Sequence, residues 1–214
     1  TQDANYILGI RSSDNVLAGD FETYQLCNTR PAGDNSPIVG STPIVMDTWY
    51  HAAFTYDGTA LKLYLNGKLD AVLYSNCIPR YDSIQHAGLG TYLTSAGAAS
   101  GYFNGVLDEV RIWNGARTQA EIIADMNQEL TSGTNLVARW GLNEGSGTAV
   151  ASSVGTFPGT LTNGPTWVTG APFNITPPPL NTLITSRVNQ GSDDAEQNAS
   201  TGAMDITSTD LELI

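Results

Sequence analysis

The sequence predicts an all-β fold of short antiparallel strands with one helix. Gly is plentiful, with 22 residues, and only 14% of the residues are charged, which is typical of turn-rich β proteins rather than of helical bundles. Short apolar runs are separated by turn dipeptides, as expected for strands joined by hairpins. With 214 residues, the chain has the length of one large all-β domain or of two small ones.

The segment 53–74, with the sequence AFTYDGTALKLYLNGKLDAVLY, shows the clearest strand pattern. It contains Asp57-Gly58 and Asn66-Gly67, the two dipeptides that best supply the positive φ angles of tight hairpin turns. Between them, Leu alternates with Lys, Tyr and Asn, so one face of the strand is apolar. The segment is therefore predicted to be a three-stranded antiparallel meander with one buried face.

A helix is predicted over residues 117–130, RTQAEIIADMNQEL, where apolar residues recur at helical spacing. Thr118 and Glu121 have the spacing of a capping box at its start. Strands are expected again over 136–168, where apolar runs alternate with Gly-rich turns. The three consecutive prolines at 177–179 predict a stiff, extended linker.

The charge of the chain excludes several classes of partner. With 21 acidic and 9 basic residues, its formal net charge is -12, which would repel phosphate backbones and anionic membrane surfaces. Nucleic-acid binding is therefore not expected, and no apolar run reaches the 18 residues that would indicate a membrane span. Cations and neutral sugars are compatible ligands.

The two cysteines, Cys27 and Cys77, match no spacing typical of a metal or redox site. We predict that they form one disulfide in a secreted or cell-surface protein, since disulfides persist in oxidising compartments. A buried pair of free thiols is the alternative.

The stretch GVLDEVRIWN, residues 105–114, places two adjacent carboxylates in an apolar strand pattern. Strand alternation would send Asp108 and Glu109 to opposite faces, so they are not expected to act together as an acid and base pair. Asp108 would lie on the drier face, where it needs backbone N–H groups, an Arg or a Ca²⁺ ion. Glu109 would lie with Arg111 on the wetter face, where cross-strand ion pairs are usual.

Three aromatic residues are candidate ligand contacts. Tyr92, Tyr102 and Phe103 flank the small-residue loop TSAGAASGY, and loops often carry binding residues. The four tryptophans lie within strand patterns and are expected in the core. His51 and His86 have no ligand spacing around them and are expected to be structural.

Three segments together resemble the laminin G-like, concanavalin A-like jelly-roll domains, which are related to pentraxins. They are WYHAAFTYDGTALKLYLNGKLD, GYFNGVLDEVRIWNGARTQAEI and LVARWGLNEGSGTAVASSVGTFPGTLTNGPTWV. The resemblance implies two antiparallel sheets packed face to face, and a non-catalytic module that binds carbohydrate or protein at the cell surface. It also implies a structural Ca²⁺ site that includes Asp108.

The resemblance further predicts a division of the chain. Residues 1–173 would form the sandwich, 174–190 a Pro-rich linker with a strand, and 191–214 an acidic tail that starts a further β module or supplies an assembly strand. The resemblance begins at about residue 5, near the third strand of the family, and the first two strands of the family are not found. The sandwich is therefore expected to be N-terminally incomplete, and to be completed by an N-terminal fragment or by self-association.

We therefore expect a calcium-stabilised, extracellular module for carbohydrate or protein binding and adhesion, without enzymatic activity. The alternative is a structural subunit of an extracellular filament or surface layer that assembles by strand complementation. A glycoside hydrolase would need two convergent carboxylates, and no strand carries the Glu-x-Asp-x-x-Glu pattern.

Overall fold

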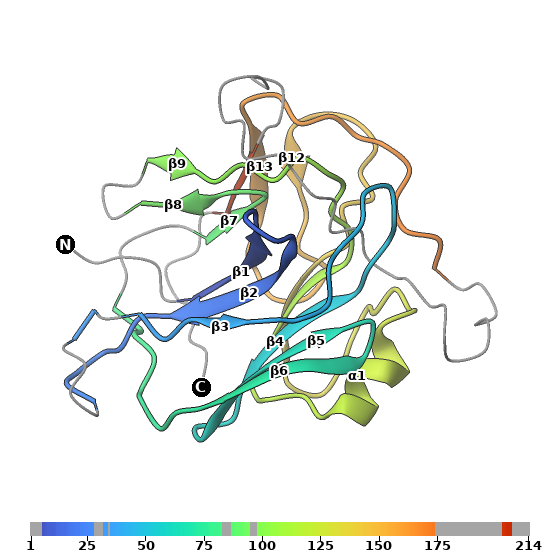
Figure 1. Cartoon of the computed structure of the whole chain (residues 1–214). Helices are drawn as coiled ribbons and strands as arrows, with labels where there is room; N and C mark the ends of the chain where they lie inside the picture. Colours follow the sequence, from blue (N-terminus) through green and yellow to red (C-terminus); the bar gives the residue numbers. More distant parts are fainter. Residues whose placement is uncertain are drawn as a thin grey trace.

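The computed structural model describes residues 6–27, 32–33, 35–82, 87–94, 98–173 and 203–206, the last as backbone only. These residues form an antiparallel β-sandwich with one short helix, which confirms the predicted fold class (Figure 1). The strands are β1 (Tyr6–Arg11), β2 (Val16–Phe21), β3 (Ile38–Val39), β4 (Ala52–Tyr56), β5 (Ala60–Leu65), β6 (Lys68–Tyr74), β7 (Ala87–Leu89), β8 (Tyr92–Leu93), β9 (Ala99–Ser100), β10 (Val110–Trp113), β11 (Leu136–Trp140), β12 (Ala149–Val150), β13 (Gly159–Thr162) and β14 (Ala203–Ile206).

The strands are grouped in antiparallel sheets. One sheet has the order β1-β2-β3, a second β4-β5-β6, and a third β12-β13-β14-β7, while β10 pairs with β11 and β8 with β9. In Figure 1, the blue β1–β3 sheet lies beside the cyan β4–β6 sheet, and β7, β8, β9, β12 and β13 lie above them. The predicted linker 174–190 lies outside the described residues, as does the predicted tail 191–214 apart from β14.

The predicted meander is confirmed as β4, β5 and β6. Asn66 and Gly67 have φ angles of 51° and 74°, as the tight turn between β5 and β6 requires. Leu61 and Leu63 are completely buried, as expected for the apolar face of β5. Tyr64 was expected on the polar face, but it is only 5% exposed. Its burial coincides with a shift of the β5–β6 register between Leu63 and Tyr64.

The predicted helix is confirmed as α1, over Gln119–Asp125. The capping box is present: Glu121 donates its N–H to the Thr118 hydroxyl, and the Glu121 carboxylate accepts the Thr118 N–H at 2.7 Å. The helix packs on the β5–β6 turn, where a Cβ atom at Gly67 would lie 2.6 Å from Ile123. Gly67 is therefore required both by its positive φ and by this close approach. Among the described residues, no helix has the length and apolar character needed to cross a membrane.

The predicted disulfide between Cys27 and Cys77 is present, so the alternative of free thiols is excluded. It closes a loop of 50 residues beside the larger of two hydrophobic clusters, and Cys77 belongs to that cluster. The buried members of the larger cluster are Leu17, Phe21, Ile38, Ile44, Tyr50, Leu61, Leu63, Leu65 and Cys77.

A second hydrophobic cluster is centred on Trp140 in β11, which is completely buried with Ala138 and Val150. The Trp140 Nε1–H donates a hydrogen bond of 2.7 Å to the carbonyl of Phe157. Trp140 also lies opposite Val110 in the β10–β11 register. The segment after α1 thus supplies the centre of this cluster and pairs directly with β10.

The strand predicted over 105–114 is shorter in the structure, where β10 spans only Val110–Trp113. Glu109 has a φ of 51°, so the extended backbone is interrupted just before β10 and strand alternation does not apply to the two carboxylates. The prediction that Glu109 lies on the wetter face is therefore wrong. Asp108 and Glu109 are both buried, at 6% and 9% exposed.

Glu109 is held between two arginines. Its Oε2 atom lies 2.7 Å from Arg111 Nη2 and 3.1 Å from Arg139 Nε, and its Oε1 atom accepts from Arg139 Nη2. The three side chains are 3%, 8% and 7% exposed for Glu109, Arg111 and Arg139. Arg111 and Arg139 lie opposite each other in the β10–β11 register. The expected cross-strand ion pair therefore exists, but it is buried.

The remaining donors of the two arginines extend this ion-pair cluster to other parts of the chain. Arg111 Nη1 donates to the carbonyl of Asp125, the last residue of α1, at 2.9 Å. Arg139 Nη1 donates to the Ser153 hydroxyl at 2.9 Å. The cluster of Glu109, Arg111 and Arg139 thus joins β10, β11, the end of α1 and the loop after β12.

We expect the substitution Glu109→Gln to lower the free energy of unfolding by about 3–5 kcal/mol, because two buried arginines would lose their only carboxylate in the cluster. Urea denaturation followed by tryptophan fluorescence would measure the change. The control is Asp14→Asn, which removes the exposed ion pair with Arg11 and should leave the unfolding midpoint almost unchanged. An equal midpoint for wild type and Glu109→Gln would contradict the structural role of the cluster.

Candidate functional site

Asp108 lies against the backbone of the segment that follows β13. Its Oδ2 atom accepts the N–H of Ala171 at 2.6 Å. A Cβ atom at Gly170 would come within 2.2 Å of the same oxygen, so only glycine allows this approach. Of the partners expected for Asp108 from the sequence, the backbone N–H group is present.

The second carboxylate oxygen of Asp108 has no such partner. Oδ1 is buried, and no hydrogen bond reaches it from the described residues. Burial raises the pKa of Asp108 to about 6. The negative charges of Glu109 and Glu129 act in the same direction, and the backbone N–H groups of Ala171 and Glu109 act against them. Asp108 is therefore a buried carboxylate with no cationic partner at either oxygen among the described residues, and its Oδ1 atom also lacks a hydrogen bond.

The neighbourhood of Asp108 limits which metal could bind there. In the part of the chain that the structure describes, no three His, Cys, Asp or Glu side chains come together as metal ligands. A cation on Oδ1 would need backbone carbonyls, amide oxygens or water as its other ligands. Ca²⁺ accepts such oxygen ligands, whereas Zn²⁺ favours His and Cys. The donor chemistry thus fits Ca²⁺ better than Zn²⁺, and Asp108 as a metal ligand stays a prediction.

The three aromatic candidates lie together at the β8–β9 hairpin. Tyr92 is in β8, opposite Ser100 in β9, and Tyr102 and Phe103 follow β9 after Gly101. Tyr92 and Tyr102 are 41% and 48% exposed, whereas Phe103 is half-buried and donates its N–H to the carbonyl of Gly90 at 2.8 Å. The hairpin therefore presents two tyrosine side chains to solvent.

The hairpin holds Tyr92 in a fixed place. A Cβ atom at Gly101 would lie 2.3 Å from Tyr92 Cε1, so the tyrosine ring rests on the Gly101 backbone. The Thr91 hydroxyl donates to the carbonyl of Ser100 at 2.6 Å and ties the two strands together beside the ring. A ring held in this way loses little conformational freedom when a ligand binds.

The tryptophans were expected in the core, and the structure confirms this for Trp140 but not for Trp49, Trp113 and Trp167, which are half-buried. Trp140 is completely buried, and Trp167 donates its Nε1–H to the carbonyl of Gly147 at 2.9 Å. The ring of Trp113 is covered by the Arg117 guanidinium, 3.8 Å from its centroid. The buried Trp140 ring is therefore not available as a ligand platform, and one face of the Trp113 ring is occupied by Arg117.

His51 also has a structural environment. Its backbone N–H donates to Asn66 Oδ1 at 2.8 Å, and its carbonyl accepts the N–H of the same residue. Burial, together with the nearby charge of Arg111, lowers the pKa of His51 to about 3, so the ring is neutral near pH 7. His86 lies outside the described residues.

One aromatic pair was not predicted from the sequence. Tyr24 and Tyr81 stack with their ring centroids 4.3 Å apart and an angle of 30° between the ring planes. Tyr24 precedes Cys27 by three residues and Tyr81 follows Cys77 by four. The predicted disulfide was thus the signal in the sequence that could have placed the two rings together.

Comparisons with known proteins agree with this architecture. Residues 1–123 match a laminin G family model that is described as the concanavalin A-like lectin/glucanases superfamily. Pappalysin-1 of Mus musculus is 28% identical over 134 residues, which cover 59% of this chain and 8% of pappalysin-1. The chain therefore spans a small part of this relative.

A crystal structure from Bacteroides ovatus ATCC 8483, described as a candidate carbohydrate binding protein, superposes with a TM-score of 0.51. The similarity covers 74% of this chain and 48% of that chain, at 20% sequence identity, and it supports the fold alone. Because the family model matches more than half of the 214 residues, the chain belongs to the concanavalin A-like lectin/glucanases superfamily.

Proposed function

We propose that this chain is a non-catalytic extracellular module that binds carbohydrate and serves in adhesion. The observation that supports binding most directly is the β8–β9 hairpin, which presents Tyr92 and Tyr102 on a fixed frame. The superfamily is described as one of lectins and glucanases, and the similar Bacteroides ovatus protein is described as a candidate carbohydrate binding protein. The disulfide between Cys27 and Cys77 is consistent with an extracellular location.

The chemistry of the chain favours neutral sugars as ligands. A tyrosine offers an apolar ring face to the C–H groups of a sugar and a hydroxyl to its oxygens. The net charge of -12 would repel uronic acids and sulfated sugars. Glu109 is unsuited to act as a catalytic acid or base, because its charge is neutralised by Arg111 and Arg139. These features favour a binding role over glycoside hydrolysis.

We expect Tyr92→Ala to weaken binding of a neutral oligosaccharide by at least about tenfold, a loss of about 1.4 kcal/mol, because the exposed ring face is removed. Isothermal titration with the strongest ligand from a glycan array would measure the change. Tyr92→Phe keeps the ring and should retain most of the affinity. Tyr74→Ala is the matched control, since it removes a tyrosine that is 81% exposed on β6. Unchanged affinity in Tyr92→Ala would exclude the hairpin as the binding site.

We further propose that Asp108 binds a structural Ca²⁺ ion. The supporting observation is its buried Oδ1 atom, which has no hydrogen-bond partner among the described residues. An uncompensated buried carboxylate is unfavourable, and a hard cation with oxygen ligands would compensate its charge. The negative charge of Glu129, which raises the pKa of Asp108, would also favour a cation there.

The raised pKa of Asp108 predicts the direction in which the melting temperature changes with pH. Without Ca²⁺, the folded pKa of about 6 is higher than the unfolded value near 3.8, so the folded state favours the protonated form of Asp108. This contribution to stability is complete below about pH 3.8 and is lost as the pH rises through 6. In EDTA at pH 7.5, Asp108→Asn should therefore melt a few degrees higher than wild type. The difference should shrink towards pH 4, as followed by differential scanning fluorimetry.

Calcium should reverse this order. At pH 7.5, added Ca²⁺ should raise the melting temperature of the wild type but not of Asp108→Asn, because the amide has no charge to offer. The control is Asp70→Asn: Asp70 accepts the N–H groups of Ser41 and Thr42 at 3.1 Å, so its loss should cost stability but leave the calcium shift intact. A calcium shift that persists in Asp108→Asn would place the ion elsewhere.

A second candidate function is assembly by strand complementation, and the position of β14 favours it. The backbone of Ala203–Ile206 pairs with β13 on one side and with β7 on the other. Because these hydrogen bonds are formed by backbone groups, a neighbouring copy of the chain could supply the same strand. Such an exchange would link chains into a filament or surface layer.

If β14 is exchanged between chains, the protein should form oligomers whose size increases with concentration, as measured by light scattering. Met204→Pro should abolish them, because proline removes a backbone donor from the strand. Met204→Ala is the control and should retain them, since the backbone pairing is unchanged. A wild-type protein that stays monomeric at every concentration would exclude this second function.

A further inference from the structure

The chain contains four Asn-Gly dipeptides, in which the asparagine side chain can react with the backbone of the next residue. They are Asn66-Gly67, Asn104-Gly105, Asn114-Gly115 and Asn163-Gly164. Glycine has no Cβ atom, so its backbone nitrogen is less hindered than that of any other residue. At these four positions, the side-chain carbonyl carbon is therefore open to attack by the neighbouring nitrogen.

This reaction needs no co-reactant except water. The deprotonated glycine nitrogen attacks the asparagine Cγ atom, the new C–N bond closes a five-membered succinimide ring, and the Cγ–Nδ2 bond breaks with release of ammonia. Water then opens the ring at either carbonyl, which gives aspartate or isoaspartate. Both the side chain and the peptide group must rotate to bring Cγ and the nitrogen together, so the rate depends on how firmly the fold holds them.

The fold holds Asn66 and Gly67 in place. Asn66 Oδ1 accepts the N–H of His51 at 2.8 Å, and the Asn66 N–H donates to the His51 carbonyl at 2.8 Å. Gly67 is buried, and its carbonyl accepts a hydrogen bond of 2.9 Å from Gln119 Nε2. Ile123 fills the space beside Gly67, as described above for the close approach of α1. The Asn66 side chain and the following peptide group can therefore rotate only when the contact between the meander and α1 opens.

The other three dipeptides are exposed at both residues. Apart from adjacent residues, no described atom lies within 4 Å of the position that a Cβ atom would take at Gly115 or Gly164. Asn163 and Gly164 follow β13 directly, with φ angles of 59° and 80°. Within the part of the chain that the structure describes, no hydrogen bond or ion pair holds the Asn163 side chain. Rotation in this turn therefore breaks few contacts.

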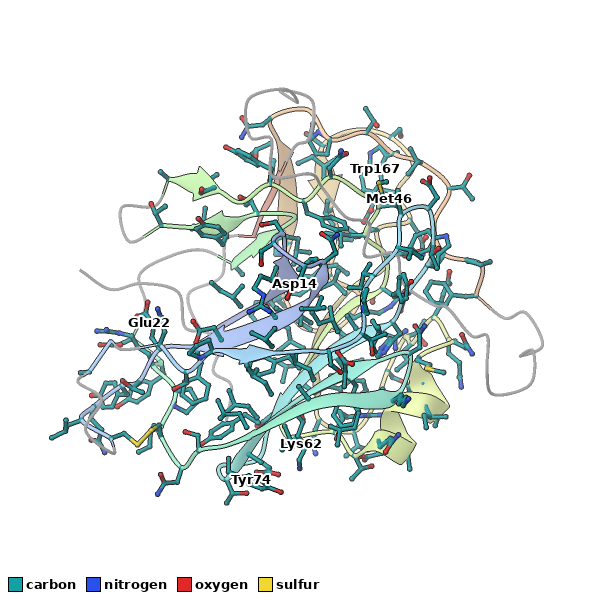
Figure 2. All side chains as sticks on the ribbon, viewed as in Figure 1. Asp14, Glu22, Met46, Lys62, Tyr74 and Trp167 are labelled. Atoms are coloured by element: carbon teal, nitrogen blue, oxygen red, sulfur yellow. A yellow bond between two sulfur atoms is a disulfide. The ribbon has the colours of Figure 1, made fainter. Side chains whose placement is uncertain are left out.

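The protected and the exposed dipeptides lie in different parts of the molecule. Lys62 is in β5, the strand that ends just before Asn66, and Trp167 follows Asn163 by four residues. Figure 2 shows Lys62 and Trp167 at opposite ends of the view. A change at one position is therefore not expected to alter the other, so each serves as an internal reference for the other.

We propose that Asn104, Asn114 and Asn163 are sites of spontaneous deamidation in the folded chain, and that the contact between the meander and α1 protects Asn66. Each conversion adds a carboxylate to a chain whose formal net charge is already -12. The isoaspartate product also adds a carbon to the main chain. At Asn163, this change falls directly after β13, the strand that pairs with β12 and β14. Deamidation does not depend on which ligand the module binds.

Peptide mapping by mass spectrometry, after incubation of the full chain at pH 7.5, would measure the conversion at all four positions. We expect Asn66 to convert at least about tenfold more slowly than the exposed asparagines, which corresponds to a local opening free energy of about 1.4 kcal/mol. Conversion should be faster at pH 8.5 than at pH 6.5, because the attacking nitrogen must lose its proton. In concentrated urea, Asn66 should convert as fast as the other three, because its contacts are lost.

Variants in α1 and after it test the cause of the protection. Gln119→Ala removes the hydrogen bond to the Gly67 carbonyl and should speed the conversion of Asn66. Gln128→Ala is the matched control, because it removes a hydrogen bond of 2.7 Å to the Ala124 carbonyl in the same region and should leave Asn66 unchanged. Equal rates at Asn66 in these two variants would contradict the protective role of the contact.

A variant at the exposed turn tests the reaction itself. Gly164→Ala places a Cβ atom beside the attacking nitrogen and should slow the conversion of Asn163 without affecting Asn66. Equal conversion of Asn66 and Asn163 in the folded chain would overturn the proposal. So would exposed asparagines that stay intact in the folded chain but convert in urea. If Asn66 remained slow in urea, its local sequence and not the fold would protect it, and the proposal would again be wrong.

Discussion

The buried charge of Glu109 constrains the rest of the structure. A carboxylate that is 3% exposed is stable only when its charge is compensated, and the two arginines that compensate it come from β10 and β11. Arg111 then reaches the end of α1, and Arg139 reaches Ser153. Elements far apart in the sequence must therefore assemble together, because any one of them alone would leave a buried charge unpaired. The cluster thus links β10, β11, the end of α1 and the loop after β12.

The backbone turn that directs Glu109 inward also determines the environment of Asp108. With φ at 51°, Glu109 leaves the extended path, and Asp108 reaches the backbone of Gly170 and Ala171 instead of a strand neighbour. Two adjacent carboxylates thus have opposite electrostatic environments. Glu109 is paired with two arginines, whereas Asp108 has only backbone N–H groups as partners and a pKa of about 6. The first serves stability, and the second is the group that would respond to protons or, in the proposed role, to a cation.

Local signals in the sequence predicted local structure well. Asn66-Gly67 and the Thr118–Glu121 capping box determine their turn and helix end through a few neighbouring backbone groups, so both could be predicted without tertiary contacts. Strand alternation gave the wrong environment for Glu109, because a single positive φ breaks it and no nearby residue indicates the break. Arg139 could not be identified as the partner of Glu109 either. The two residues are 30 positions apart in the sequence, and only the β10–β11 register brings them together.

The environments of the aromatic rings explain why tyrosines rather than tryptophans are proposed as ligand contacts. Trp140 fills the second hydrophobic cluster, and the Trp113 ring is covered by Arg117, so both large rings stabilise the fold. Tyr92 instead rests on a glycine backbone and is 41% exposed. A half-exposed ring braced from behind keeps its orientation without being buried. On an acidic protein surface, such rings would contact the C–H groups of a sugar without relying on charge, so the proposed binding role favours neutral sugars over anionic ones.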